Sequence, residues 1–133
     1  MKLNGFFLIA IPVFASLFSS CEGNTDYEWI IQNDASSLIS VKANNAIYQD
    51  STKTNIASNQ QEKLMTYSML GGSSKPLDPG ASFSDLLILN SDGDTLKKDY
   101  QLNTNWNITI TTVSKIPANY KHQYLFQVTD NDF

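Results

Sequence analysis

Apolar residues recur at every second position along most of this chain, and this period constrains the fold more than any other feature of the sequence. Such alternation is typical of β-strands with one buried face, whereas an amphipathic helix repeats every 3.6 residues. The clearest case is 106–111, where Trp106, Ile108 and Ile110 alternate with Asn and Thr. The continuous apolar run 86–89 indicates a central strand covered on both faces. No window of twelve residues shows a convincing helical stripe.

The same alternation predicts four further strands, and β-branched and aromatic residues dominate them, as strands prefer. They are 27–32, 39–43, 65–69 and 120–129. About seven strands in one domain, 27–133, predict an all-β fold, an antiparallel two-sheet sandwich of immunoglobulin-like architecture. The Cys-Trp-Cys pattern of true immunoglobulin domains is absent from the sequence. A small up-and-down β-barrel is the alternative.

One hairpin can be assigned a register from its turn. Asp92-Gly93 separates two strand-like runs, and this dipeptide favours a two-residue type I′ turn because both residues take a positive φ. That turn would pair Leu89 with Leu96 and place both leucines on one face.

Two polar stretches are predicted to be loops. Asn44–Glu62 is crowded with amide and hydroxyl side chains, and only Ile47-Tyr48 and Ile56 interrupt it, each as a short edge strand. Gly71–Ser82 contains prolines and glycines that exclude a regular ladder. Rigid sandwich domains commonly bind their ligands through loops, so we expect these two stretches to form the surfaces that contact a partner.

The first 20 residues are predicted to be a lipoprotein signal peptide. A positive start, Met1-Lys2, precedes an apolar run of thirteen residues, Phe6–Phe18, which at 1.5 Å per residue is too short to span a bilayer as a helix. The run ends in Leu17-Phe18-Ser19-Ser20-Cys21, which resembles the lipobox of bacterial lipoproteins. This resemblance implies acylation of Cys21, with 21–26 as a tether; Phe18 stands where the family usually has an aliphatic residue. An ordinary signal peptide that leaves Cys21 as a free thiol is the alternative.

The composition of the chain argues against nucleic-acid binding. The chain has 133 residues and a net charge of −4, and all nine of its basic residues are Lys. Removal of the first 20 residues leaves 113 and also removes Lys2, so the net charge falls to −5. An acidic chain without Arg is a poor match for nucleic acid, whose phosphates are bound mainly by basic side chains.

His122 is the only imidazole, so any acid–base or metal-based mechanism would depend on it. It shares a face with Tyr120 and Tyr124, and no second His or partner motif accompanies it. We therefore expect a neutral His packed in the core, no catalytic residue, no cofactor and a protein that is not an enzyme.

Asn90, Asp92 and Asp94 are weak metal candidates, because their oxygens resemble a fragment of a calcium loop. The acidic residue that would complete an EF-hand is missing, since position 101 is Gln. Alternating Asx residues around Gly are also what a hairpin turn selects, so the hairpin is the favoured interpretation.

Two tyrosines and two short motifs remain as surface candidates. Tyr48 and Tyr100 fall outside the inward-facing aromatic set and are possible partner contacts. Asp50-Ser51-Thr52 and Asp94-Thr95-Leu96 resemble the short sequons at which some Gram-negative bacteria O-glycosylate exported proteins.

The lipobox, the short tether, the two Trp strands, the NSDGDT hairpin and the closing YLFQVTDNDF together resemble small outer-membrane or surface lipoproteins of Gram-negative gut commensals. This resemblance implies one immunoglobulin-like sandwich held on the cell surface through the lipid on Cys21. The expected function is a non-enzymatic cell-envelope lipoprotein, a binding or structural module for a protein or glycan partner. A small inhibitor of a secreted hydrolase and a glycan-binding accessory lipoprotein are the alternatives.

Overall fold

The computed structural model describes residues 22–133, and the predicted signal peptide and Cys21 lie outside them. The described residues form seven strands and three short 3₁₀ helices. The strands are β1 (Asn24–Asn33), β2 (Ile39–Asn45), β3 (Ser51–Ile56), β4 (Gln60–Leu70), β5 (Phe83–Leu89), β6 (Trp106–Lys115) and β7 (Ala118–Val128). The 3₁₀ helices are η1 (Gly80–Ser82), η2 (Asn103–Asn105) and η3 (Asp130–Asp132).

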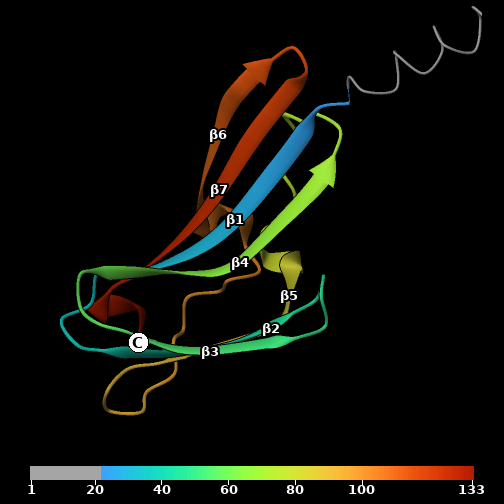
Figure 1. Ribbon diagram of the computed structural model, residues 1–133. Helices are drawn as coiled ribbons and strands as arrows, with labels where there is room; N and C mark the ends of the chain where they lie inside the picture. Colours follow the sequence, from blue (N-terminus) through green and yellow to red (C-terminus); the bar gives the residue numbers. More distant parts are fainter. Residues whose placement is uncertain (1–21) are drawn as a thin grey trace, which may run out of the picture.

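The strands form two sheets, of four strands in the order β4-β1-β7-β6 and of three in the order β3-β2-β5. Neither sheet closes into a barrel, so the predicted two-sheet sandwich is confirmed and the barrel alternative is wrong. All neighbouring strands pair antiparallel except β1 and β7, which run parallel with Thr25 beside Tyr120 and Asn33 beside Val128. The parallel pair joins the first and last strands of the chain at the centre of the larger sheet (Figure 1).

The core lies between the lower half of the larger sheet and the smaller sheet. On β1, the side chains of Tyr27, Trp29 and Ile31 point inward and are fully buried. They meet the inward side chains of β2 and β7, as the alternation of these strands requires. The largest fully buried side chains include Trp29, Tyr27, Tyr124, Phe126, Ile31, Ile39 and Ile88.

The two sheets differ in length, and the difference exposes one end of the larger sheet. Strands β1, β4, β6 and β7 have ten or eleven residues, whereas β2, β3 and β5 have six or seven. In Figure 1 the larger sheet continues upward well beyond the smaller one. Trp106 is therefore buried at the start of β6, whereas Ile108 and Ile110, which follow it on the same face, are exposed.

Strand β3 was predicted only in part: a short edge strand was expected at Ile56, which is the last residue of β3, whereas residues 51–55 were expected to lie in a loop. It has the sequence STKTNI, in which only Ile56 is apolar and buried. An edge strand can be polar on its outward face and half-exposed on the other, so it lacks the alternation of a buried strand. The predicted edge strand at Ile47-Tyr48 is also wrong, since these residues lie in the turn between β2 and β3. At the other end of the stretch, β4 already begins at Gln60.

The predicted type I′ hairpin is wrong by one residue in register. Leu89 pairs with Thr95 rather than with Leu96, and Gly93 has φ +88° while Asp92 has no positive φ. The N–H of Gly93 donates to the Asn90 carbonyl, and the N–H of Asn90 donates to the Asp94 carbonyl. This is a type I turn followed by a glycine bulge, a three-residue loop that uses the same residues as the predicted turn.

Gly71–Ser82 contains no strand, as predicted, but the segment packs against the larger sheet. The N–H of Ser73 donates to Thr25 Oγ1 at 2.8 Å, and the N–H of Leu77 donates to the Tyr124 hydroxyl at 2.8 Å. Burial raises the pKa of Tyr124 to about 12, so this hydroxyl stays neutral and accepts the bond throughout the physiological range. The segment covers part of the inner face that the smaller sheet leaves open.

Candidate functional site

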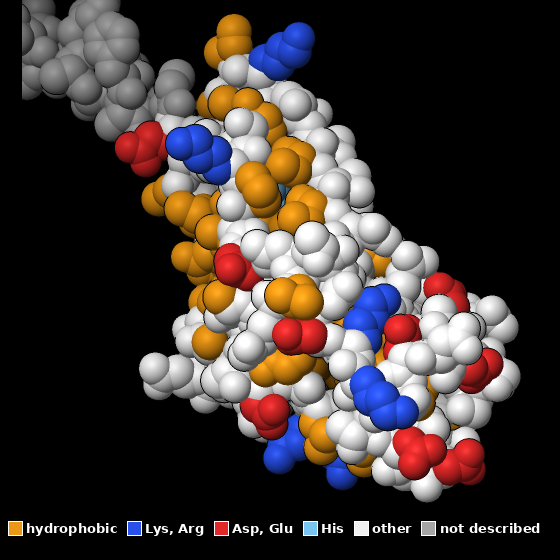
Figure 2. Space-filling model, turned by 180° about the vertical axis from the view of Figure 1, so that it is seen from behind, with side chains coloured by type: hydrophobic (Ala, Val, Ile, Leu, Met, Phe, Trp, Pro, Cys, Tyr) orange, Lys and Arg blue, Asp and Glu red, His pale blue; other side chains and the backbone are white. Residues whose placement is uncertain are grey.

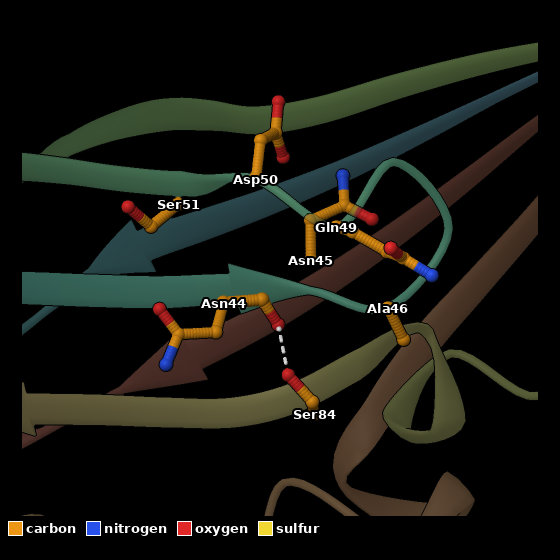
Figure 3. A pocket seen from close by; sticks show the side chains of 7 residues that line it. All are labelled: Asn44, Asn45, Ala46, Gln49, Asp50, Ser51 and Ser84. Atoms are coloured by element: carbon orange, nitrogen blue, oxygen red, sulfur yellow. Dashed lines mark hydrogen bonds between the residues drawn. The ribbon is translucent and has the colours of Figure 1, made fainter.

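A polar hollow of about 610 Å³ lies where the turn between β2 and β3 meets the start of β5. Its volume is in the range of small-ligand pockets, although it is open to solvent on one side. Figure 3 shows the side chains that line it, which come from the end of β2, the turn, the start of β3 and the start of β5. They are Asn44, Asn45, Ala46, Gln49, Asp50, Ser51 and Ser84.

Asn45 holds the turn that shapes the hollow. Its side-chain oxygen accepts hydrogen bonds from the N–H groups of Ile47 and Tyr48, at 2.7 and 3.1 Å, and its own N–H donates to the Asp50 carbonyl at 2.8 Å. The side chain is buried, and its amide nitrogen contacts the sulfur of Met65. An Asx side chain that accepts from the two following N–H groups replaces the bonds a strand would have made. These bonds fix the conformation of the turn that borders the hollow.

Four polar side chains of the hollow make no hydrogen bond to another described residue: those of Asn44, Gln49, Asp50 and Ser51. Asn44 forms a hydrogen bond within the hollow only through its backbone, whose carbonyl accepts from the Ser84 hydroxyl at 3.2 Å. Asp50 is the only charged residue of the lining. The hollow thus presents amides and a hydroxyl, which both donate and accept, and one carboxylate.

The two tyrosines singled out from the sequence have different surroundings. Tyr48 is 53% exposed and lies on the turn of the hollow without lining it; its ring is edge-on to Tyr67 of β4, at 6.1 Å between centroids. Tyr100 is partly buried against the core, and its carbonyl accepts from Trp106 Nε1 at 2.7 Å. Tyr48 is therefore the more accessible of the two predicted contacts.

His122 is fully buried on the inner face of β7, the position predicted for it. Its Nε2 lies 2.7 Å from the Ser73 carbonyl, which can only accept, so the proton is on Nε2. Its Nδ1 has no hydrogen-bond partner, and the ring packs against Tyr27 at 4.8 Å between centroids. The imidazole thus fills the core and anchors the segment that follows β4.

The hairpin residues proposed as metal ligands are used by the turn itself. Asn90 Oδ1 accepts from the N–H groups of Asp92 and Asp94, at 3.0 and 2.8 Å, and Asn90 Nδ2 donates to Asp94 at 3.3 Å. Within residues 22–133, no three His, Cys, Asp or Glu side chains come together as a possible metal site. In the two glycosylation motifs, Ser51 and Thr95 are both exposed, and Ser51 lines the hollow.

Glu28 forms the main charged cluster on the outer face of the larger sheet. Its carboxylate contacts Lys63 Nζ at 2.8 Å and Lys121 Nζ at 3.1 Å, and it accepts from Gln123 Nε2 at 3.0 Å. Burial by itself would raise the pKa of Glu28, but the bonds from Lys63, Gln123 and Lys121 outweigh it and lower the pKa to about 2. The cluster joins β4, β1 and β7 across the parallel pair.

Sequence reasoning missed two features of the surface. Ser84 reaches the hollow only because β2 and β5 pair, which no local pattern reports. The apolar side chains of Leu70, Val113 and Ile116 are the most exposed of the large apolar residues in the described chain, at 76%, 65% and 90%. Leu70 and Val113 lie near strand ends and Ile116 in a turn, positions where alternation predicts no core contact.

No protein-family model and no curated protein sequence matches this chain. Within residues 22–133, no helix has both the length and the apolar character needed to cross a bilayer. What the fold and the hollow define is a small all-β two-sheet domain with a polar, solvent-open recess.

Proposed function

We propose that this protein is a non-enzymatic lipoprotein of the cell envelope, anchored through Cys21 on the outer membrane or cell surface, and that its sandwich binds a neutral glycan in the hollow beside β2. The observation that carries the glycan assignment is the group of polar side chains of Asn44, Gln49 and Ser51, which line a solvent-open recess and have no hydrogen-bond partner among the described residues. Sugar hydroxyls both donate and accept hydrogen bonds, and amide and hydroxyl side chains match both roles. The lipid anchor rests on the lipobox ending in Cys21.

The charge of the hollow selects among glycans. Asp50 is its only charged residue, and no lysine lines it. A uronic acid or sulfated sugar would meet a carboxylate without a compensating cation, so neutral sugars are favoured. The non-enzymatic assignment is supported by His122, the only imidazole, which is enclosed in the core and bonded to Ser73.

The inhibitor alternative has less support from the geometry. A plug must project from the domain, whereas Gly71–Ser82 is bonded to Thr25 and Tyr124 of its own larger sheet. The turn 45–50 is short and held by Asn45. The glycan-binding role is therefore the one proposed.

The test uses the full acylated chain, solubilised in detergent, and a panel of immobilised neutral polysaccharides: starch, galactomannan and arabinoxylan. At least one should retain the protein, and Asn44→Ala with Ser51→Ala should weaken that retention about tenfold, the effect of losing about 1.4 kcal/mol of hydrogen bonding. The matched control is Asn103→Ala with Ser91→Ala, at exposed positions away from the hollow. Absence of retention by the whole panel, or equal retention of both variants, would refute glycan binding in the hollow. Intact mass spectrometry of the same sample reports the lipid on Cys21 and any sugar on Ser51.

A further inference from the structure

Three segments of the chain meet at the upper end of the larger sheet in Figure 1: the start of β1, the end of β4 and the turn between β6 and β7. The N–H of Asn24 donates to Asn119 Oδ1 at 2.6 Å, and the N–H of Gly71 donates to the Gly23 carbonyl at 2.7 Å. Gly23 is buried and packs so closely on the Ala118 carbonyl that a Cβ would overlap it. The chain is therefore held in place from Gly23 onward.

This end also carries exposed apolar side chains. Single exposed apolar residues are ordinary on a protein surface. Here, however, the three most exposed large ones of the described chain lie toward this end: Leu70 ends β4, Ile116 lies in the β6–β7 turn, and Val113 lies in β6 three residues before that turn. Figure 2 shows apolar side chains over the narrow upper part of the molecule, while most acidic side chains lie on the wider lower part.

The position of the lipid attachment site follows from covalent geometry. Cys21 precedes Gly23 by two residues, so its Cα lies within about 7.6 Å of the Gly23 Cα. Ile116 lies in the turn, also two residues before Ala118, which neighbours Gly23 and begins β7, the strand parallel to β1. The turn at Ile116 therefore extends about as far from the sheet as the acylated residue can.

We propose that this end of the sheet, defined by Leu70, Val113 and Ile116 and here named the apolar tip, rests on the bilayer that holds the acyl chains of Cys21. The inference depends on the lipid anchor of the proposed function. Acyl chains attached within two residues of Gly23 leave no room for a long spacer between domain and membrane. Exposed aliphatic side chains are stabilised at the acyl–headgroup boundary, about 5–10 Å deep.

The charged residues near the apolar tip favour contact with a phospholipid surface on the side of the β6–β7 turn. Lys115 lies next to Ile116 in the turn, where its ammonium can reach a phosphate while its stem lies along the apolar surface. Glu22 and Asp26 lie on the β1 side, and the Asp26 carboxylate already accepts from Asn24 and Ser68. We therefore expect the β6–β7 turn to enter the interface more deeply than the start of β1.

The experiment exploits the single cysteine of the chain. Because acylation occupies Cys21, the variant Ile116→Cys carries one free thiol, which can be labelled with an environment-sensitive nitrobenzoxadiazole fluorophore. The labelled full chain is reconstituted in vesicles of phosphatidylethanolamine and phosphatidylglycerol, with and without brominated acyl chains. Leu70→Cys is a second probe position, and Asp92→Cys, on the exposed hairpin remote from the apolar tip, is the matched control. None of the three side chains is buried, so each variant should keep its fold.

The probes at 116 and 70 should emit at shorter wavelength than the probe at 92, and brominated lipid should quench them several-fold more strongly. Equal, water-like emission at all three positions in a chain whose mass includes the lipid would overturn the apolar tip but not the anchor. A blue shift at 116 without quenching by brominated lipid would indicate a second copy of the chain instead, and would also overturn it. A mass without lipid, and a chain that does not float with vesicles, would refute the proposed anchor and the tip with it.

Discussion

Glu28→Gln should destabilise the domain near neutral pH and have a smaller effect in acid. The carboxylate is 13% exposed and receives bonds from Lys63, Lys121 and Gln123, which lower its pKa from the ordinary 4.5 to about 2. Gln has nearly the same shape but no charge, so the variant removes the two ion pairs while it preserves the packing of β1 between β4 and β7.

The size of the effect follows from linkage. At 1.36 kcal/mol per pKa unit, the difference between 4.5 and about 2 would correspond to about 3 kcal/mol. This is an upper bound, because the side chains of Lys63 and Lys121 are 47% and 40% exposed, and solvent and salt screen such pairs. We expect a loss of about 1–1.5 kcal/mol in the free energy of unfolding at pH 7 and low salt.

The pH dependence has a definite sign. A carboxyl group whose pKa is lower in the folded state contributes stability above its unfolded pKa, and the contribution is lost as pH falls toward the folded pKa. The difference between parent and variant should therefore be constant above about pH 5.5 and shrink steadily between about pH 5 and pH 2. Urea unfolding followed by tryptophan fluorescence, at several pH values, measures it.

Two results would contradict this reasoning. One is a difference in unfolding free energy that stays the same from pH 7 to pH 3, which would mean that Glu28 acts through shape and not through charge. The other is a difference that 1 M NaCl leaves unchanged, since partly exposed ion pairs are weakened by salt. Asp85→Asn, an exposed carboxylate in β5 with no ion pair among the described residues, is the control and should change stability little.

Two further substitutions test the packing around the segment that follows β4. His122→Ala should lower the free energy of unfolding by about 2–4 kcal/mol, because it leaves a cavity and an unpaired Ser73 carbonyl; thermal unfolding within a degree of the parent would show that the imidazole does not support the core. Gly72→Ala should cost about 1–3 kcal/mol, because its Cβ would overlap the Ala118 carbonyl; an unchanged midpoint in a urea titration would show that the two segments can separate freely.

The sequence predicts the fold where one strand carries its own signal. Trp29 and Ile31, or Tyr124 and Phe126, lie two residues apart, and each pair is buried on one face, as the alternation indicates. The prediction of strands is sound here because the period is a local consequence of the extended backbone. The two-sheet architecture then follows, since each sheet has one apolar face to bury.

Local patterns do not predict features that depend on distant segments. β3 can be polar because it lies at the edge of its sheet, where most of its side chains are not buried. Only its pairing with β2 makes it a strand. The parallel pairing of β1 with β7 joins residues nearly a hundred positions apart. In the hairpin, Asp92-Gly93 fits two turn types, and the bonds to Asn90 favour the three-residue loop that shifts the register.

The same distinction applies to the candidate site. Asn44, Asn45 and Ser51 fall within a stretch that composition alone predicted as a contact surface, because amide-rich segments seldom enter a core. Composition could not show that Asn45 would be buried as the support of the turn while Asn44 stays free. That division of roles depends on which face of β2 each residue occupies, and so on register.

The turn that shapes the hollow and the apolar tip are connected through strand β4. Tyr48, on the turn that shapes the hollow, lies against Tyr67, and Tyr67 precedes Leu70 of the apolar tip by three residues on the same strand. Three residues of strand span about 10 Å. This path ends at Leu70, however, whereas Ile116 lies in the β6–β7 turn at the upper end of the larger sheet, and the hollow lies at the level of the smaller sheet (Figure 1). A domain seated on its apolar tip would therefore hold the hollow away from the bilayer. Such a position leaves the hollow open to a glycan that approaches from the side away from the membrane, because the bilayer would not cover it.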